Sequence, residues 1–136
     1  MLRHVVCTSF SAPVQLLARS VAATPLPPSS VRIQVKAAGV NFADHLQVKN
    51  LYQEKLAPPF VAGFESYGQV VESTGSVKVG DWVCCSQPGA FSSSLVAPDS
   101  NVFSFGNKPA KSRVEAAALL VTYRMILELK PVNICG

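Results

Sequence analysis

Short apolar runs separated by turn-forming residues dominate this chain and predict a mainly β fold. Residues 31–37 read V-R-I-Q-V-K-A, in which apolar and polar side chains alternate with the period of two that a half-buried strand requires. The other predicted strands are equally short and are bounded by Gly, Pro, Asn, Asp or Ser; they lie at 5–10, 14–21, 68–72, 82–85, 91–96 and 101–105. Many short strands with frequent turns are typical of a β-barrel or sandwich.

A short helix is predicted directly after the strand that ends at residue 39. Asn41 is a good N-cap for a helix from Phe42 to Lys49. Phe42 and Leu46 are spaced i, i+4 and are expected on its inner face. Asn50 follows, and asparagine tolerates the left-handed conformation that ends many helices.

A second helix is predicted near the C-terminal end. Ser112 and Glu115 form the S-x-x-E pattern of a capping box, in which both side chains satisfy helix-end amides. The helix is expected from Arg113 to Lys130, where Pro131 would end it.

Length and charge narrow the class of protein. The 136 residues are 49% hydrophobic and 15% charged, which fits one folded domain and excludes disorder. The net charge of +4 comes from four scattered basic residues within residues 1–43, where no acid occurs. We therefore expect no nucleic-acid partner, because phosphate binding needs clustered bases. No apolar run reaches 18 residues, so no membrane span is expected.

The acid-free start of the chain leaves two locations open. A mitochondrial transit peptide is Arg-rich, Ser-rich and poor in acids. The strand pattern at residues 5–10 and 14–21 instead favours a folded N-terminus and a cytoplasmic protein. We take the cytoplasm as the prediction and the mitochondrion as the alternative.

The four cysteines do not suggest a metal site. Cys84 and Cys85 are adjacent in a predicted strand, so their side chains should point to opposite faces and cannot share one tetrahedral zinc ion. Buried thiols in a reducing compartment are the simpler interpretation.

The residues show no familiar catalytic signature, and only polar residues at element ends remain as candidates. His45 is expected on the surface. The glycines at 63 and 68 do not form a phosphate-binding loop, because the middle glycine is missing and a strand follows. The remaining candidates are Asn41, Asp44, Tyr52, Glu65 and Thr122. By residue type alone they are more often caps and turns than ligand contacts.

Several motifs together resemble one family. The runs A-A-G-V-N-F-A-D at 37–44, P-P-F-V-A-G-F-E-S-Y-G at 58–68, V-K-V-G-D-W-V at 77–83 and E-A-A-A-L-L-V-T-Y at 115–123 occur in family order and spacing. The chain thereby resembles the zinc-independent quinone oxidoreductases of the medium-chain dehydrogenase/reductase superfamily, over residues 3–130. The resemblance implies a GroES-like, partly open β-barrel at 1–111. It makes 112–136 a helix leading toward a nucleotide-binding Rossmann domain, which is expected to be absent from this chain.

The resemblance also implies a chemistry and a site. In this family hydride passes from NADPH to a quinone or enone without a metal. Asn41 matches an asparagine near the nicotinamide and the acceptor, and Tyr52 matches a tyrosine of the pocket. Thr122 is offered as a substitute for a nicotinamide-contacting threonine. Asp44 and Glu65 are expected to make structural hydrogen bonds. The zinc-dependent branch has Cys and His ligands near Asn41 and at Phe64, so no metal is expected.

Without a Rossmann domain, the resemblance predicts an inactive catalytic domain that does not bind NADPH tightly, and no oligomer. The alternative is a non-enzymatic module that binds a protein partner through an exposed apolar face. The candidates for that face are Leu119, Val121, Met125 and Leu129.

Overall fold

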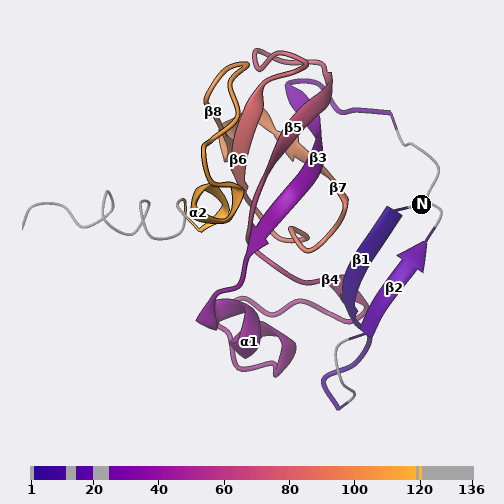
Figure 1. Cartoon of the computed structure of the whole chain (residues 1–136). Coiled ribbons are helices and arrows are strands. Elements are labelled where there is room, and N and C mark those ends of the chain that lie inside the picture. The colour runs from indigo at the N-terminus through magenta and orange to yellow at the C-terminus, as the bar shows by residue number, and fades with distance from the viewer. Residues whose placement is uncertain (1, 12–14, 20–24, 119, 121–136) are drawn as a thin grey trace, which may run out of the picture.

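The computed structural model describes residues 2–11, 15–19, 25–118 and 120 (Figure 1). Its elements are β1 (Leu2–Cys7), β2 (Gln15–Arg19), β3 (Ser30–Gly39), α1 (Phe42–Val48), β4 (Phe60–Val61), β5 (Glu65–Ser73), β6 (Trp82–Ser86), β7 (Ser94–Pro98), a 3-10 turn (Asp99–Asn101), β8 (Val102–Ser104) and α2 (Arg113–Ala117). The prediction of a mainly β fold with few helices is confirmed. No helix in the described part of the chain is long and apolar enough to cross a membrane.

Two antiparallel sheets make up the domain. The larger is a curled half-barrel with the strand order β7-β3-β5-β6-β8, and the smaller has the order β2-β1-β4 (Figure 1). In the larger sheet β3 pairs with β5 in a register that sets Gly39 opposite Glu65. This register brings the end of β3 and the start of β5 together, and the candidate site is built there.

The alternating pattern places apolar side chains on both faces of the larger sheet. On one face Ile33, Val70 and Val83 form a core together with Cys85. On the other face Cys84 lies in a second core that α2 covers. The two neighbouring thiols therefore point to opposite faces and both are buried, as predicted.

Helix α1 confirms the predicted cap and stop but not the predicted inner face. Asn41 is its N-cap, and Asn50 has φ 58° just beyond its end. Phe42 is 74% exposed, so its expected burial is wrong; Asp44 and Gln47 are the buried residues. The reason is the first turn, where Asp44 accepts a hydrogen bond from the cap amide and faces the protein. Phe42 precedes Asp44 by two residues, about 200° around the axis, and therefore faces solvent.

The strand predicted at 91–96 begins later, at Ser94, because the chain changes sheets before that point. Residues 91–93 pair with β1 through a bridge between His4 and Ser92, and β7 then joins β3. The two strands predicted at the N-terminus exist as β1 and β2, which pair with each other. β1 begins and ends three residues earlier than the predicted strand at 5–10.

The start of the second helix is confirmed. The Oγ atom of Ser112 accepts a hydrogen bond from the amide of Glu115 at 3.2 Å, as an N-cap does. Helix α2 is described from Arg113 to Ala117. The rest of the helix predicted to Lys130 lies outside the described residues.

Candidate functional site

Asn41, in the short segment between the end of β3 and the start of α1, is hydrogen-bonded to Glu65. The side-chain Nδ2 of Asn41 donates to Oε1 of Glu65 at 2.9 Å, and the backbone amide of Asn41 donates to Oδ2 of Asp44 at 2.7 Å. Glu65 is 2% exposed and Asp44 is 4% exposed. Two buried carboxylates therefore fix the backbone and the side chain of Asn41, as the structural hydrogen bonds expected of Asp44 and Glu65 require.

The environment of Asp44 alters its acidity. Burial raises the pKa of the Asp44 carboxyl, the hydrogen bond from the Asn41 amide lowers it, and the negative charge of Glu65 raises it further. Its second oxygen, Oδ1, is buried without a hydrogen-bond partner. Asp44 therefore holds its proton to a higher pH than an exposed aspartate does.

The close approach of Glu65 to the end of β3 depends on a glycine. A Cβ atom built on Gly39 would overlap the Glu65 side chain, including the oxygen that accepts from Asn41. Any larger residue at this position would displace the carboxylate. In the G-V-N sequence of residues 39–41, the glycine thus leaves the space that the Glu65 carboxylate needs to reach Asn41.

Tyr52 reaches the same region from the loop that follows α1. Its ring lies 5.9 Å from the ring of Phe64, centroid to centroid, in a tilted arrangement. Phe64 immediately precedes Glu65, so the structure brings Asn41 and Tyr52 to the entry of one strand, β5. Thr122, the third predicted contact, lies outside the described residues, as do Leu119, Val121, Met125 and Leu129 of the predicted apolar face.

The pairing of Asn41 with Glu65 is the feature that sequence reasoning missed. The residues are 24 positions apart, and neither local spacing nor residue type links them. The signal that would have found the pair is the β3–β5 register, which sets Gly39 opposite Glu65 and so places Asn41 beyond it. That register depends on where β3 and β5 bulge, which the residue pattern does not indicate.

The buried cysteines do not supply a nucleophile to this site. Burial raises the pKa of Cys84 and of Cys85 to about 12, with a smaller contribution from Glu65 at Cys84. The Cys84 thiol lies 3.0 Å from the carbonyl oxygen of Ala116. Within the described residues, no group of three or more His, Cys, Asp or Glu side chains is placed to hold a metal ion.

The curled antiparallel half-barrel, with its short capped helix between β3 and β5, defines a GroES-like domain of the kind found in medium-chain dehydrogenases and reductases. Residues 27–107 match the alcohol dehydrogenase GroES-like domain family. The chain belongs to this family.

Individual relatives point in the same direction. The chain is 34% identical, over 126 residues, to the Quinone oxidoreductase-like protein 2 homolog of Nematostella vectensis, covering 89% of this chain and 34% of the relative. The structure of a probable oxidoreductase from Mycobacterium abscessus aligns with a TM-score of 0.76 and 30% identity, over 93% of this chain and 41% of that chain. A mycobacterial protein complexed with NADPH aligns with a TM-score of 0.73 and 26% identity, over 98% and 42%. The chain thus spans 34% of the curated relative's length.

Proposed function

We propose that this domain is the acceptor-binding half of an oxidoreductase that reduces a quinone or enone with NADPH and without a metal. The observation that carries the proposal is that a buried carboxylate, Glu65, holds the side-chain amide of Asn41 in place. Its Nδ2 has two hydrogens, and Glu65 accepts one of them at 2.9 Å. The other hydrogen is the group that we propose for the acceptor's carbonyl oxygen. The likeness to quinone oxidoreductase-like proteins supports this assignment.

The proposed role of Asn41 follows from the charge that hydride transfer creates. NADPH, when bound, supplies the hydride. As the acceptor receives it, negative charge develops on the carbonyl oxygen, and a fixed N–H donor stabilises that charge. Glu65 holds the donor in place, so Asn41 does not have to reorient during the reaction. Tyr52, whose ring packs against Phe64 at the entry of β5, is proposed to line the same pocket.

Within the described residues, the segment from Gly63 to Gly68 is not built to hold the phosphates of such a cofactor. The segment from Gly63 leads directly into β5, whereas a pyrophosphate is held at a helix N-terminus after a glycine-rich turn. A few hydrogen bonds of about 0.5–1.5 kcal/mol each do not hold a dinucleotide. We therefore propose that the 136-residue chain alone does not bind NADPH tightly and is inactive.

Two experiments test these statements separately. Titration of NADPH into the purified chain, followed by calorimetry, should show no saturable binding below about 1 mM. Micromolar binding would contradict the proposal that this chain alone does not bind NADPH tightly.

The second experiment tests the chemistry. Residues 1–130 are grafted onto the nucleotide-binding domain of a quinone oxidoreductase relative, and NADPH-dependent quinone reduction is measured.

In the grafted enzyme, Asn41→Ala should lower kcat by about 10²-fold while NADPH binding is retained, because one charge-stabilising donor is lost. Gln53→Ala is the control, since Gln53 is an exposed residue of the neighbouring loop. A chimera that binds NADPH and reduces quinone equally well with Asn41→Ala would contradict the proposed role.

A further inference from the structure

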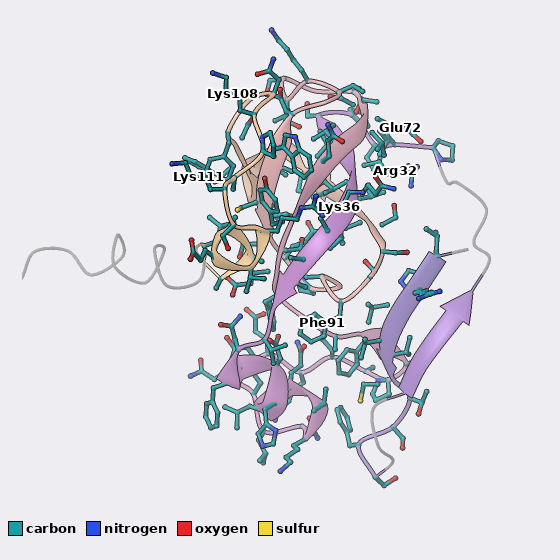
Figure 2. The ribbon with its side chains drawn as sticks, viewed as in Figure 1. Arg32, Lys36, Glu72, Phe91, Lys108 and Lys111 are labelled. Atoms are coloured by element: carbon teal, nitrogen blue, oxygen red, sulfur yellow. The ribbon has the colours of Figure 1, made fainter. Side chains whose placement is uncertain are left out.

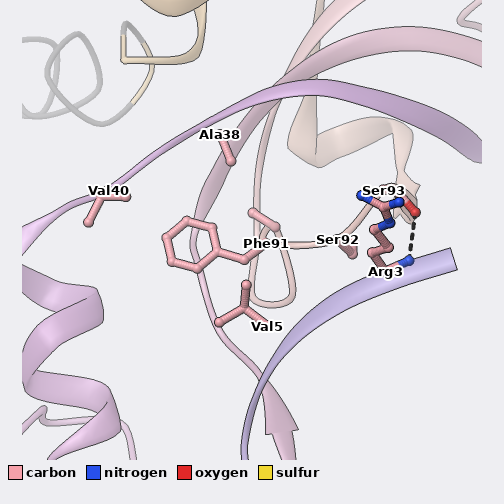
Figure 3. Close-up of a pocket in the computed structure, with 8 residues that line it drawn as sticks. Arg3, Val5, Ala38, Val40, Phe91, Ser92 and Ser93 are labelled. Carbon is pink, nitrogen blue, oxygen red and sulfur yellow. Dashed lines mark hydrogen bonds between the residues drawn. The ribbon is translucent and has the colours of Figure 1, made fainter. Parts of the chain in front are cut away.

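A hollow of about 480 Å³ opens where the two sheets diverge (Figure 3). β3 pairs with β7 only as far as Gln34 opposite Ser94. Residues 91–93 follow β1, with hydrogen bonds of 2.9 Å from the Val5 amide to the Phe91 carbonyl and from the Ser93 amide to the Arg3 carbonyl. β3 keeps one bond to this segment, from the Val35 amide to the Ser93 carbonyl at 3.1 Å. The space between the end of β3 and β1 is therefore not filled by a strand.

The walls of this hollow are apolar, and the aromatic wall is held in place. Val5, Ala38, Val40 and Phe91 line it (Figure 3). The amide of Phe91 donates to the carbonyl of Ala62 at 2.9 Å. Its ring lies against Gly63, where a Cβ atom would overlap the ring. The aromatic wall is thus fixed by backbone contacts on both sides.

One end of the hollow is cationic. The Arg3 side chain lies beside Ser93 at this end, and the Arg3 amide donates to the Ser93 hydroxyl at 2.9 Å (Figure 3). That bond uses an oxygen lone pair of Ser93 and leaves the hydroxyl hydrogen available. Arg3 is exposed, and the one ion pair found in the described part of the chain joins Arg32 to Glu72 instead. The guanidinium is therefore not neutralised by a carboxylate there.

The other end disfavours charge. A second hollow, of about 200 Å³, shares Val5, Val40 and Phe91 with the first and is bounded by Asp44 and His45. An anion placed here would meet mostly apolar walls and the Asp44 carboxyl, with no lysine or arginine in the lining to pair with it. The arginine and the hydroxyl at the first end together match one carboxylate.

From this arrangement we propose that the hollow binds a small monocarboxylic acid with an apolar tail. The carboxylate lies at Arg3 and Ser93, and the tail extends along Val5, Phe91 and Val40. The volume is within the range of small-molecule sites. This site is separate from the acceptor-binding role proposed for Asn41, and neither depends on the other.

Octanoate is the probe, and the purified chain is titrated with it while amide shifts are followed by ¹H–¹⁵N NMR. The expected result is saturable binding with the largest shifts at the amides of Arg3, Val5, Phe91 and Ser93. Octan-1-ol should bind about tenfold more weakly because it has no charge for Arg3. Octanedioate should also bind more weakly, because its second carboxylate would lie against the apolar walls.

Arg3→Gln tests the anchor directly. It should weaken octanoate binding about tenfold and leave octan-1-ol binding unchanged. Arg3 contributes to the fold through its backbone, so the variant should stay folded, which its amide spectrum will show. Lys108→Gln removes the same charge from an exposed residue away from Phe91 and should have no effect (Figure 2).

Three outcomes would overturn the proposal. The first is no saturable octanoate binding to the folded chain, and the second is shifts centred on other residues. The third is an equal loss of affinity in Arg3→Gln and Lys108→Gln, which would show a general charge effect.

Discussion

The side-chain amide of Asn41 donates to a carboxylate oxygen of Glu65 across 2.9 Å, and this bond ties the start of α1 to the first residue of β5. Because Glu65 is 2% exposed, the bond is shielded from water and involves a charge. Glu65→Gln should lower the free energy of unfolding by about 1–2 kcal/mol, measured by urea denaturation. It should also shift the NMR signals of the Asn41 side-chain amide.

Glu72→Gln is the matched control for that change. Glu72 makes an ion pair with Arg32 at 3.0 Å, but its side chain is 51% exposed. Exposed pairs contribute about 0–1 kcal/mol, so this variant should lose less stability and leave the Asn41 signals in place. Equal losses in the two variants, with unchanged Asn41 signals, would mean that the Asn41–Glu65 bond does not form in solution.

Asp44 should give the domain a specific pH dependence. Its pKa is raised above the ordinary value of 3.8, chiefly by burial, so the folded state binds this proton more tightly than the unfolded state does. The associated stability is lost as pH rises through the folded pKa and is fully present below the unfolded value. Relative to Asp44→Asn, the wild-type chain should therefore gain stability as pH falls from 7 toward 4.

Urea denaturation of both proteins at several pH values measures this difference, and carboxyl groups elsewhere cancel from it. Glu54→Gln is the control, because Glu54 is exposed and changing it should leave the pH profile unaltered. A difference between wild type and Asp44→Asn that does not change with pH would show that Asp44 is not buried as described.

Local residue patterns predicted the helices and strands. The candidate site depends instead on the register of β3 against β5, which those patterns do not indicate. The alternation of residues 31–37 predicted β3, and Asn41 and Asn50 predicted both ends of α1, because these signals depend on near neighbours. The contact of Asn41 with Glu65 depends on β-bulges between β3 and β5. The exposure of Phe42 has a similar cause, since a buried polar contact at Asp44 sets the rotation of α1 against the apolar pattern.

Two glycines of adjacent strands should respond differently to alanine. At Gly68 a Cβ atom would overlap the backbone carbonyl of Gln34 in β3, which cannot move without breaking the sheet. At Gly39 it would overlap the Glu65 side chain, which can move only by leaving Asn41. Both variants should lose stability, by about 1–3 kcal/mol or more, with Gly68→Ala the larger loss.

The NMR signals of the Asn41 side chain distinguish the two glycine variants. They should move in Gly39→Ala, because Glu65 is displaced, and should stay in place in Gly68→Ala if that chain still folds. Movement in neither variant, or a Gly39→Ala chain as stable as wild type, would contradict the close packing of Glu65 against Gly39.

The buried thiols should resist alkylation in the folded chain. Burial raises the pKa of Cys84 and Cys85 to about 12, so at pH 8 only about one molecule in 10⁴ carries the reactive thiolate at either position. In a background with both Cys7→Ser and Cys135→Ser, iodoacetamide should therefore leave Cys84 and Cys85 unmodified for hours by mass spectrometry and modify both in concentrated urea. Adding Ser100→Cys, an exposed position, should give prompt single labelling. Fast modification of Cys84 in the folded chain would show that α2 does not cover that face of the sheet.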